Sequence, residues 1–199
     1  MEFKKLTTSV ILGAGLLISG LITDAYSAGA YRHTESGNNL GFKGIGPRIG
    51  FVDPQGALDG TAEVGVVFDF GELAPRLKLD GSASFWSTGR NYRYYNGNHY
   101  EGYDWTVRDL ILRAGVNYRF LEGDWVPYAG GGIGLHFYSW DYNDAPNYNN
   151  NSDSQIGIYL DGGIEHQLSD AWTGQMQLQS DFVNLDQTAL LFNFIYRLQ

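Results

Sequence analysis

The sequence predicts an all-β fold, an eight-stranded antiparallel up-and-down transmembrane β-barrel. Three observations support this prediction. Apolar and polar residues alternate with a period of two in eight segments of the chain. The last segment carries large apolar residues at every second position from Leu190 to Leu198. The two long connections both fall at one end of the expected barrel. A strand can lie in lipid only when all its backbone groups are paired, so the sheet must close on itself.

The N-terminal residues predict a cleaved secretory signal peptide. Two lysines near the start precede an apolar run at 10–23, and small residues follow. The apolar run is shorter than the roughly 20 residues that a spanning helix needs. Cleavage after Ser27 and cleavage after Ala30 both fit the small-residue pattern, so both sites stay open. The expected organisation is a signal peptide at 1–30, a short periplasmic tail at 31–39 and a barrel at 40–199.

Composition excludes several classes of function. The chain has a formal net charge of −9 and no cysteine, which argues against nucleic acid as a partner and excludes thiolate catalysis and cysteine zinc sites. The four histidines are scattered without metal-ligand spacing. We therefore expect no metal site, no cofactor and no nucleic-acid partner.

The first four strands are expected at 40–52, 60–70, 76–88 and 106–121. In the first two, Gly46 and Gly65 fall on the polar side of the alternation. In the third, Lys78 lies on that side. The fourth is the clearest, because apolar residues such as Leu112 alternate with charged ones such as Arg113.

The last four strands are expected at 126–142, 154–168, 172–184 and 188–199. The fifth has glycine at every second position around Gly132, and the sixth sets Ile158 against Asp161. The seventh repeats glutamine on its polar side, as at Gln177, and the eighth repeats large apolar residues, as at Phe192. A soluble lipid-carrier barrel would have the same period. Glycines on the polar face favour a crowded polar interior instead, so the apolar face is expected to meet lipid.

Connection lengths set the expected orientation. Short connections at 71–75, 122–125 and 169–171 predict periplasmic turns, and long ones at 89–105 and 143–153 predict extracellular loops. Aromatic residues are expected at headgroup depth near both ends. The periplasmic set is Phe68, Phe70, Tyr118, Phe120, Trp125, Tyr128, Trp172 and Tyr196, and the extracellular set is Phe85, Trp86, Trp105, Phe137 and Trp140.

The signal peptide, the eight alternating strands, the segment from Trp125 to Gly134 and the aromatic final strand resemble the small outer-membrane β-barrel family of OmpA transmembrane-domain and OmpX type. The resemblance covers nearly all of the mature chain. It implies a location in the outer membrane of a Gram-negative bacterium. It also implies outer-membrane lipid, lipopolysaccharide and the barrel-insertion machinery as partners. The final Gln199 departs from the family, many of whose members end on Phe.

Inward charges form the first candidate site. We expect them to make a network of ion pairs that fills the lumen, because a barrel of eight strands is only just wide enough for side chains and buried charges must be paired. The alternative is a lined pore. The expected network consists of Arg48, Glu63, Asp69, Lys78, Asp80, Asp109, Arg113, Arg119, Asp161, Glu165, Asp181 and Arg197.

Two further candidates lie toward the extracellular end. His136 and Ser139 invite comparison with lipid A deacylases, but residues three apart on a strand face opposite ways. The long loop at 89–105 is rich in tyrosine, asparagine and glycine, a composition that makes adaptable contact surface. Its expected contacts to an extracellular protein or glycan are Tyr92, Tyr94, Tyr95, Tyr100 and Tyr103.

These patterns lead to one functional hypothesis and two alternatives. The chain is expected to be a non-enzymatic outer-membrane barrel with a structural or surface-interaction, adhesion-like role through two extracellular hairpins. The alternatives are a narrow, porin-like or lateral channel for small or hydrophobic solutes, and a lipid A-modifying enzyme.

Overall fold

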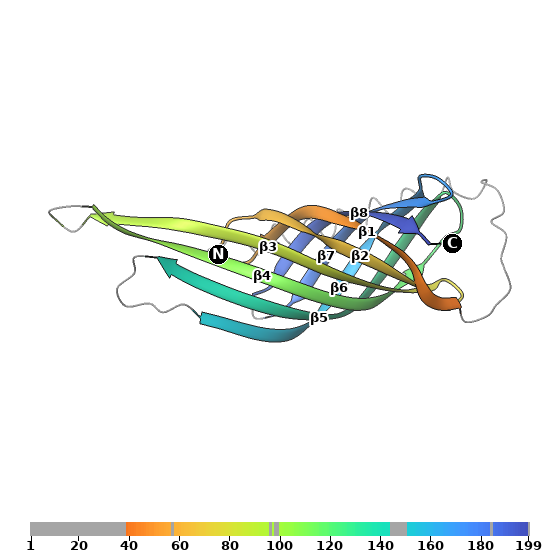
Figure 1. The fold of residues 1–199 in the computed structure, drawn as a ribbon, viewed down its shortest axis with the longest axis horizontal. Helices are drawn as coiled ribbons and strands as arrows, with labels where there is room; N and C mark the ends of the chain where they lie inside the picture. The colour runs from red at the N-terminus through yellow and green to blue at the C-terminus, as the bar shows by residue number, and fades with distance from the viewer. Residues whose placement is uncertain are drawn as a thin grey trace. The chain divides into compact units, whose positions relative to one another are not determined.

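The computed structural model describes residues 39–56, 58–95, 97, 100–143, 151–183 and 185–198. Its strands are β1 (Asn39–Pro54), β2 (Thr61–Ala74), β3 (Leu77–Tyr95), β4 (Tyr100–Arg119), β5 (Trp125–Asn143), β6 (Asn151–Gln167), β7 (Trp172–Phe182) and β8 (Gln187–Arg197). Each strand pairs antiparallel with the next in chain order, and β8 pairs with β1, so the sheet closes into a barrel (Figure 1). The predicted fold class is confirmed.

Some expectations are outside these ranges. The predicted signal peptide and all but the last residue of the predicted tail are not described, so both stay predictions. Within the described ranges, no helix is long and apolar enough to cross a membrane.

The barrel has an apolar outside and a largely polar inside, as the alternation predicts. On β8, the outward residues Phe192 and Phe194 are 40% and 42% exposed, whereas the intervening Asn193 is 1% exposed. On β4, Leu112 is 45% exposed and its neighbour Arg113 only 5%. Because side chains on a strand alternate between its two faces, one face of every strand meets the surroundings of the barrel and the other fills the lumen.

Inward glycines make room for the side chains that fill the lumen. A Cβ atom on Gly115 would lie 2.1 Å from the hydroxyl oxygen of Tyr159, and a Cβ on Gly163 would lie 2.8 Å from that of Tyr128. Both tyrosines are buried. Tyr128 therefore lies inside the barrel, and the prediction that it marks the membrane interface is wrong.

The two ends of the barrel differ in their connections. At one end, here called the turn end, are the connections β2–β3, β4–β5 and β6–β7. The opposite end, here called the hairpin end, carries the other four connections. The β2–β3 turn is only Pro75–Arg76, and Arg76 has a positive φ of 67°. A proline followed by a residue with positive φ suits the central positions of a tight type II turn.

Strands β3 and β4 are longer than predicted. Their ladder continues without a register shift to the pair Tyr95 and Tyr100, so most of the expected loop at 89–105 is a two-stranded ribbon (Figure 1). The predicted strands, 76–88 and 106–121, stop at the hairpin end where the alternation of apolar residues stops. Backbone pairing does not require apolar side chains, and tyrosine itself favours extended structure, so the ladder continues into polar sequence.

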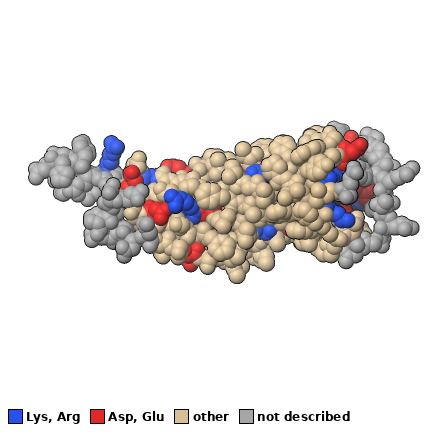
Figure 2. All heavy atoms as spheres, viewed as in Figure 1, with Lys and Arg blue, Asp and Glu red and all other residues tan. Residues whose placement is uncertain are grey.

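Charged residues are concentrated toward the ends of the barrel. In the view of Figure 2, basic and acidic atoms gather near both ends, and the middle is mostly covered by other residues. The exposed large apolar residues include Ile49, Leu112, Ile133, Leu160 and Phe192 from five different strands. This distribution is the one expected of a barrel that spans a bilayer.

Candidate functional site inside the barrel

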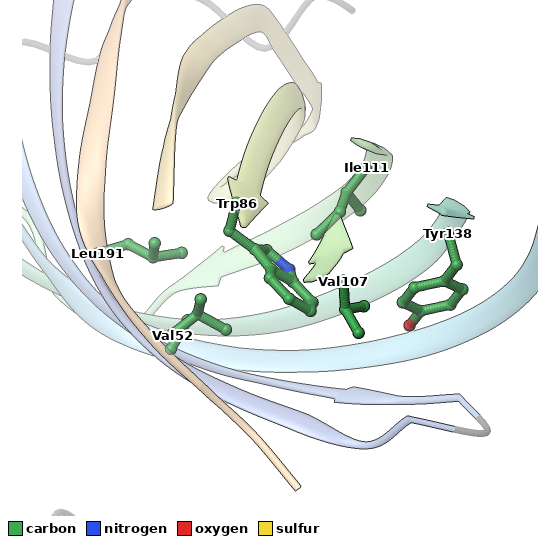
Figure 3. Packing of buried hydrophobic residues seen from close by; sticks show 7 residues of the cluster. Val52, Trp86, Val107, Ile111, Tyr138 and Leu191 are labelled. Carbon is green, nitrogen blue, oxygen red and sulfur yellow. The ribbon is translucent and has the colours of Figure 1, made fainter. Parts of the chain in front are cut away.

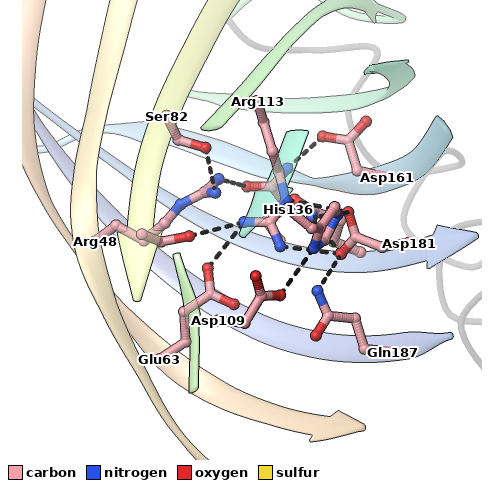
Figure 4. A network of polar contacts seen from close by, with 12 residues as sticks. Arg48, Glu63, Ser82, Asp109, Arg113, His136, Asp161, Asp181 and Gln187 are labelled. Carbon is pink, nitrogen blue, oxygen red and sulfur yellow. Dashed lines mark hydrogen bonds and ion pairs between the residues drawn. The ribbon is translucent and has the colours of Figure 1, made fainter. Parts of the chain in front are cut away.

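The centre of the lumen is built around Arg113 of β4, whose side chain is 1% exposed. Its guanidinium donates to both carboxylate oxygens of Asp181 on β7, from Nε at 3.1 Å and from Nη2 at 3.0 Å. Nη1 donates to Glu63 Oε1 on β2 at 3.0 Å and to Ser84 Oγ on β3 at 2.9 Å. One cation therefore ties together four strands through charge-assisted hydrogen bonds. Figure 4 shows Arg113 among its carboxylate partners Glu63 and Asp181.

A histidine–aspartate pair lies beside this centre. His136 Nδ1 on β5 is 2.8 Å from Asp109 Oδ2 on β4, and both side chains are fully buried. His136 Nε2 is 3.9 Å from Asp181 Oδ1, and the hydroxyl of Tyr138 lies 3.4 Å from His136 Nδ1. Ser139 is on the opposite face of β5, as the sequence predicts, so the structure does not bring this serine to the histidine.

A second group surrounds Arg48 of β1. Its guanidinium donates to Asn193 at 2.8 Å, to Ser82 at 2.8 Å and to Gln177 at 2.7 Å. Gln177 in turn donates to Asp161. Among the described contacts Arg48 makes no ion pair, so neutral groups satisfy this charge.

A third group lies toward the turn end. Lys78 Nζ on β3 is 2.8 Å from Asp69 Oδ2 and 3.5 Å from Glu165 Oε2. Arg119 on β4 is 2.9 Å from Glu165 and 3.1 Å from Glu72. Glu165 thus joins two cations from neighbouring strands.

The structure places the remaining members of the expected network as follows. Asp80 accepts a hydrogen bond from Asn117. Arg197 is half-buried at the end of β8, and in the described part of the chain its side chain joins none of these ion pairs.

Neutral amides are the partners that the sequence prediction omitted. Gln179 donates to both oxygens of Asp181, at 3.2 and 3.0 Å, and Gln187 donates to its Oδ2 at 3.4 Å. Gln175 donates to Glu165 at 2.9 Å. The signal was visible, because β7 has glutamine at every second position from 175 to 179. Amides satisfy buried carboxylates without adding charge.

The protein does not satisfy every buried acceptor near the centre. Glu63 Oε2, Asp109 Oδ1 and Gln187 Oε1 have no partner among the described groups. A buried oxygen without a donor is costly, so this region depends on the cation at its centre to offset its surplus of acceptors.

An apolar cluster, here called the cap, closes the lumen at the hairpin end. It consists of Val52, Trp86, Val107, Ile111, Tyr138, Ala189 and Leu191 (Figure 3). Leu58, Trp105, Trp140 and Leu185 pack against it. Trp86 is 1% exposed. The prediction that Trp86 marks the outer interface is therefore wrong, because it shares the inward face with Ser84, and its neighbour Phe85 points outward. The same prediction is wrong for Trp105 and Trp140, which share the inward faces of Val107 and Tyr138 and pack against the cap.

Two short connections take part in closing this end. Leu58 comes from the β1–β2 connection and Leu185 from the β7–β8 connection, and both pack against the cap. The backbone N–H of Gln55 donates to the carbonyl of Asp186 at 2.7 Å, which joins the two connections. The lumen is thus covered by apolar side chains on the side where the tall hairpins rise.

The predicted contact tyrosines are located only by their backbone. Tyr92, Tyr94 and Tyr95 lie in β3, and Tyr100 and Tyr103 lie in β4, where Tyr92 pairs with Tyr103. Their side chains are outside the described part of the structure, so their role as contacts stays a prediction.

An ion pair at the hairpin end gives a pH prediction. Arg90 donates to both carboxylate oxygens of Asp59, at 2.9 and 2.6 Å, and this hydrogen bonding holds the pKa of Asp59 below its ordinary value of 3.8. A depressed folded-state pKa stabilises the fold above the unfolded-state pKa, and this stabilisation is lost as pH falls through the folded-state pKa. We expect Arg90→Gln to raise the pKa of Asp59 toward 3.8 in a carboxyl NMR titration. Arg108→Gln is the control and should leave the pKa of Asp59 unchanged. If Asp59 has the same pKa in Arg90→Gln as in wild type, Arg90 is not the group that lowers it.

Comparison with solved structures gives several barrels of the same architecture. Ail of Yersinia pestis, in complex with the heparin analogue sucrose octasulfate, has 15% identity and a TM-score of 0.52, over 83% of this chain and 100% of that one. Neisserial surface protein A has 11% identity and a TM-score of 0.58, over 83% and 100%. A major outer membrane protein of Thermus thermophilus has 15% identity and a TM-score of 0.53, over 78% and 99%.

The fold is that of the small outer-membrane β-barrels. Because the sequence identities are this low, the similarity to these structures shows only a shared fold. For the fold, it confirms the resemblance seen in the sequence. No protein-family model matches this chain, and no curated protein matches it.

Proposed function

We propose that this chain is a non-enzymatic integral outer-membrane barrel with a capped lumen. Its β3–β4 and β5–β6 hairpins interact with molecules outside the cell. The observation that carries the proposal is the length by which β3 and β4 extend beyond the apolar belt of the barrel. Among the side chains described on the outer face of β3, Phe85 is the last large apolar one, and the strand continues to Tyr95. At about 3.3 Å per residue, this is roughly 33 Å of strand beyond the apolar belt.

The outer surface supports the membrane location. On β4 the outward apolar residues run from Leu110 to Tyr118 and are followed by Phe120 beyond the strand. Ten residues on a strand tilted by about 40° span roughly 25 Å, which matches the apolar band of outer-membrane barrels. Trp125, Trp172 and Tyr196 lie on the outside near the turn end, where aromatic side chains anchor a barrel at the headgroups.

The interior favours this role over both alternatives. A channel needs a continuous aqueous path, whereas Trp86 and Leu191 are buried in the cap across the mouth. A deacylase needs a nucleophile beside its base, whereas His136 lies inside under the cap and Ser139 faces outward. The lumen therefore supports a rigid structural role, with lipid, lipopolysaccharide and the insertion machinery as the expected partners of the barrel itself.

The test shortens one hairpin without disturbing the barrel. Asn91 and Asp104 are paired across the β3–β4 ladder, so residues 92–103 can be replaced by Asn-Gly, which favours a two-residue hairpin turn. We expect cells that express the shortened protein to lose nearly all the binding to immobilised glycans and extracellular-matrix proteins that wild type confers. A full-length variant with threonine at the five tyrosines separates the effect of side chains from that of height.

Two results would count against this function. One is equal binding by cells with wild-type, shortened or no barrel, while all barrels show heat-modifiable migration on gels. The other is stepwise single-channel conductance of wild type in planar bilayers, which would instead favour the channel.

A further inference from the structure

We propose that outward residues of β3, β4, β5 and β6 just above the apolar belt form a docking site for the phosphorylated headgroup of an outer-leaflet lipid. The site, here called the headgroup row, consists of Ser87, Arg108, Ser139 and Ser152. This inference rests on the proposed outer-membrane location and goes beyond it by naming a site and a ligand chemistry.

The row is aligned by the strand register. Ser87 pairs with Arg108, Arg108 with Ser139, and Ser139 with Ser152. Residues paired in this way lie side by side on the same face of a sheet. Three hydroxyl groups and one guanidinium therefore lie side by side in one row across four adjacent strands.

The row borders apolar residues on three of its four strands. Two residues further into the barrel on β3, β4 and β5 are Phe85, Leu110 and Phe137, which are also paired in register, whereas the corresponding residue on β6 is Ser154. The three apolar residues are 41%, 46% and 41% exposed on the outer face. Acyl chains would contact these three residues, so the next row outward lies at the depth of the lipid headgroups.

The geometry of Arg108 leaves donors available at that depth. Its Nη1 lies 2.5 Å from Asp141 Oδ2, and its side chain is 49% exposed. Asp141 pairs with Thr106, one step further from the apolar belt, so the ion pair holds the guanidinium on the polar side of the boundary. An arginine has five N–H donors, and Asp141 accepts from one nitrogen in the structure.

Phosphate is the anion that fits this set of groups. Guanidinium groups bind phosphate oxygens through charge-assisted hydrogen bonds, and serine hydroxyls add neutral donors. The existing ion pair is not a strong competitor, because exposed ion pairs contribute little in water. A lipid phosphate at this depth can therefore share the guanidinium with Asp141, while its acyl chains pack on Phe85, Leu110 and Phe137.

The experiment measures retention of lipid A by the purified, heat-modifiable full-length barrel in detergent, by native mass spectrometry and by titration. The probes are diphosphorylated lipid A and the same lipid with its phosphates removed. The test variant is Arg108→Gln with Ser139→Ala. The control is Arg76→Gln, because Arg76 forms a similarly exposed ion pair with Glu122, at 2.9 Å, at the turn end.

We expect the test variant to bind diphosphorylated lipid A about tenfold more weakly than wild type, the loss that follows from removing charge-assisted bonds to one phosphate. The control should bind as wild type, and dephosphorylated lipid should bind wild type and test variant equally. Equal binding of diphosphorylated lipid A by wild type and test variant overturns the headgroup row, as does equal binding of both lipids by wild type. If the wild-type protein does not insert into bilayers at all, the proposed outer-membrane location fails together with the row.

Discussion

Replacement of Arg113 by methionine is expected to lower the free energy of unfolding by about 3–5 kcal/mol, because it leaves buried carboxylates without their cation. Asp181 and Glu63 are 1% and 0% exposed and both bond to Arg113. Neighbouring amides cannot replace the lost charge. Urea unfolding of the barrel in lipid vesicles, followed by gel migration, measures the change.

Two matched variants test the reason for this loss. Arg108→Met removes an exposed arginine from the same strand and should change stability by less than about 0.5 kcal/mol. Adding Glu63→Gln and Asp181→Asn to Arg113→Met removes the unpaired charges and should restore much of the stability. If Arg113→Met unfolds at the same urea concentration as wild type, the network does not depend on this cation.

Replacement of Gly46 by alanine is expected to prevent correct closure of the barrel. A Cβ at Gly46 would lie 1.6 Å from the backbone carbonyl oxygen of Phe194 on β8, so the two backbones would have to separate. The pairs on either side, Ile45 with Tyr196 and Arg48 with Asn193, join the first strand to the last. We expect a cost of at least about 3 kcal/mol, at the upper end of that for overpacking, seen as loss of the heat-modifiable folded band.

Gly162→Ala is the matched control. Gly162 also lies within a strand, but a Cβ there would have its nearest contact at 3.6 Å, an ordinary packing distance. This variant should fold as wild type. Folding of Gly46→Ala with the yield and stability of wild type would contradict the close approach of β1 and β8.

The alternation in the sequence was enough to predict the closed barrel and the facing of most residues, because a period of two follows directly from strand geometry. It failed where the strand continues without apolar residues, as at Tyr92. It also failed where aromatic positions were read by residue type instead of by face, as at Tyr128 and Trp86. Trp86 was expected at the membrane interface, although its place between Phe85 and Ser87 puts it on the inward face.

The candidate site was predictable only as a set of inward charges. Which of these side chains contact each other across the lumen depends on how the barrel closes. The two-residue alternation along each strand contains no information on that. Arg113 and Asp181 are 68 residues apart in the chain, and Arg48 reaches Gln177 across 129 residues. The amides of β7 were visible on the polar face, but their pairing with carboxylates depends on distances across the lumen.

The cap has a consequence for assembly. Val52 belongs to the first strand and Leu191 to the last, and both pack in the same cluster as Trp86. Those side chains cannot come together until the two ends of the sheet have met. The mouth therefore becomes dry only after β1 and β8 have paired, and a sheet in which this pair is still open leaves its charged centre in contact with water.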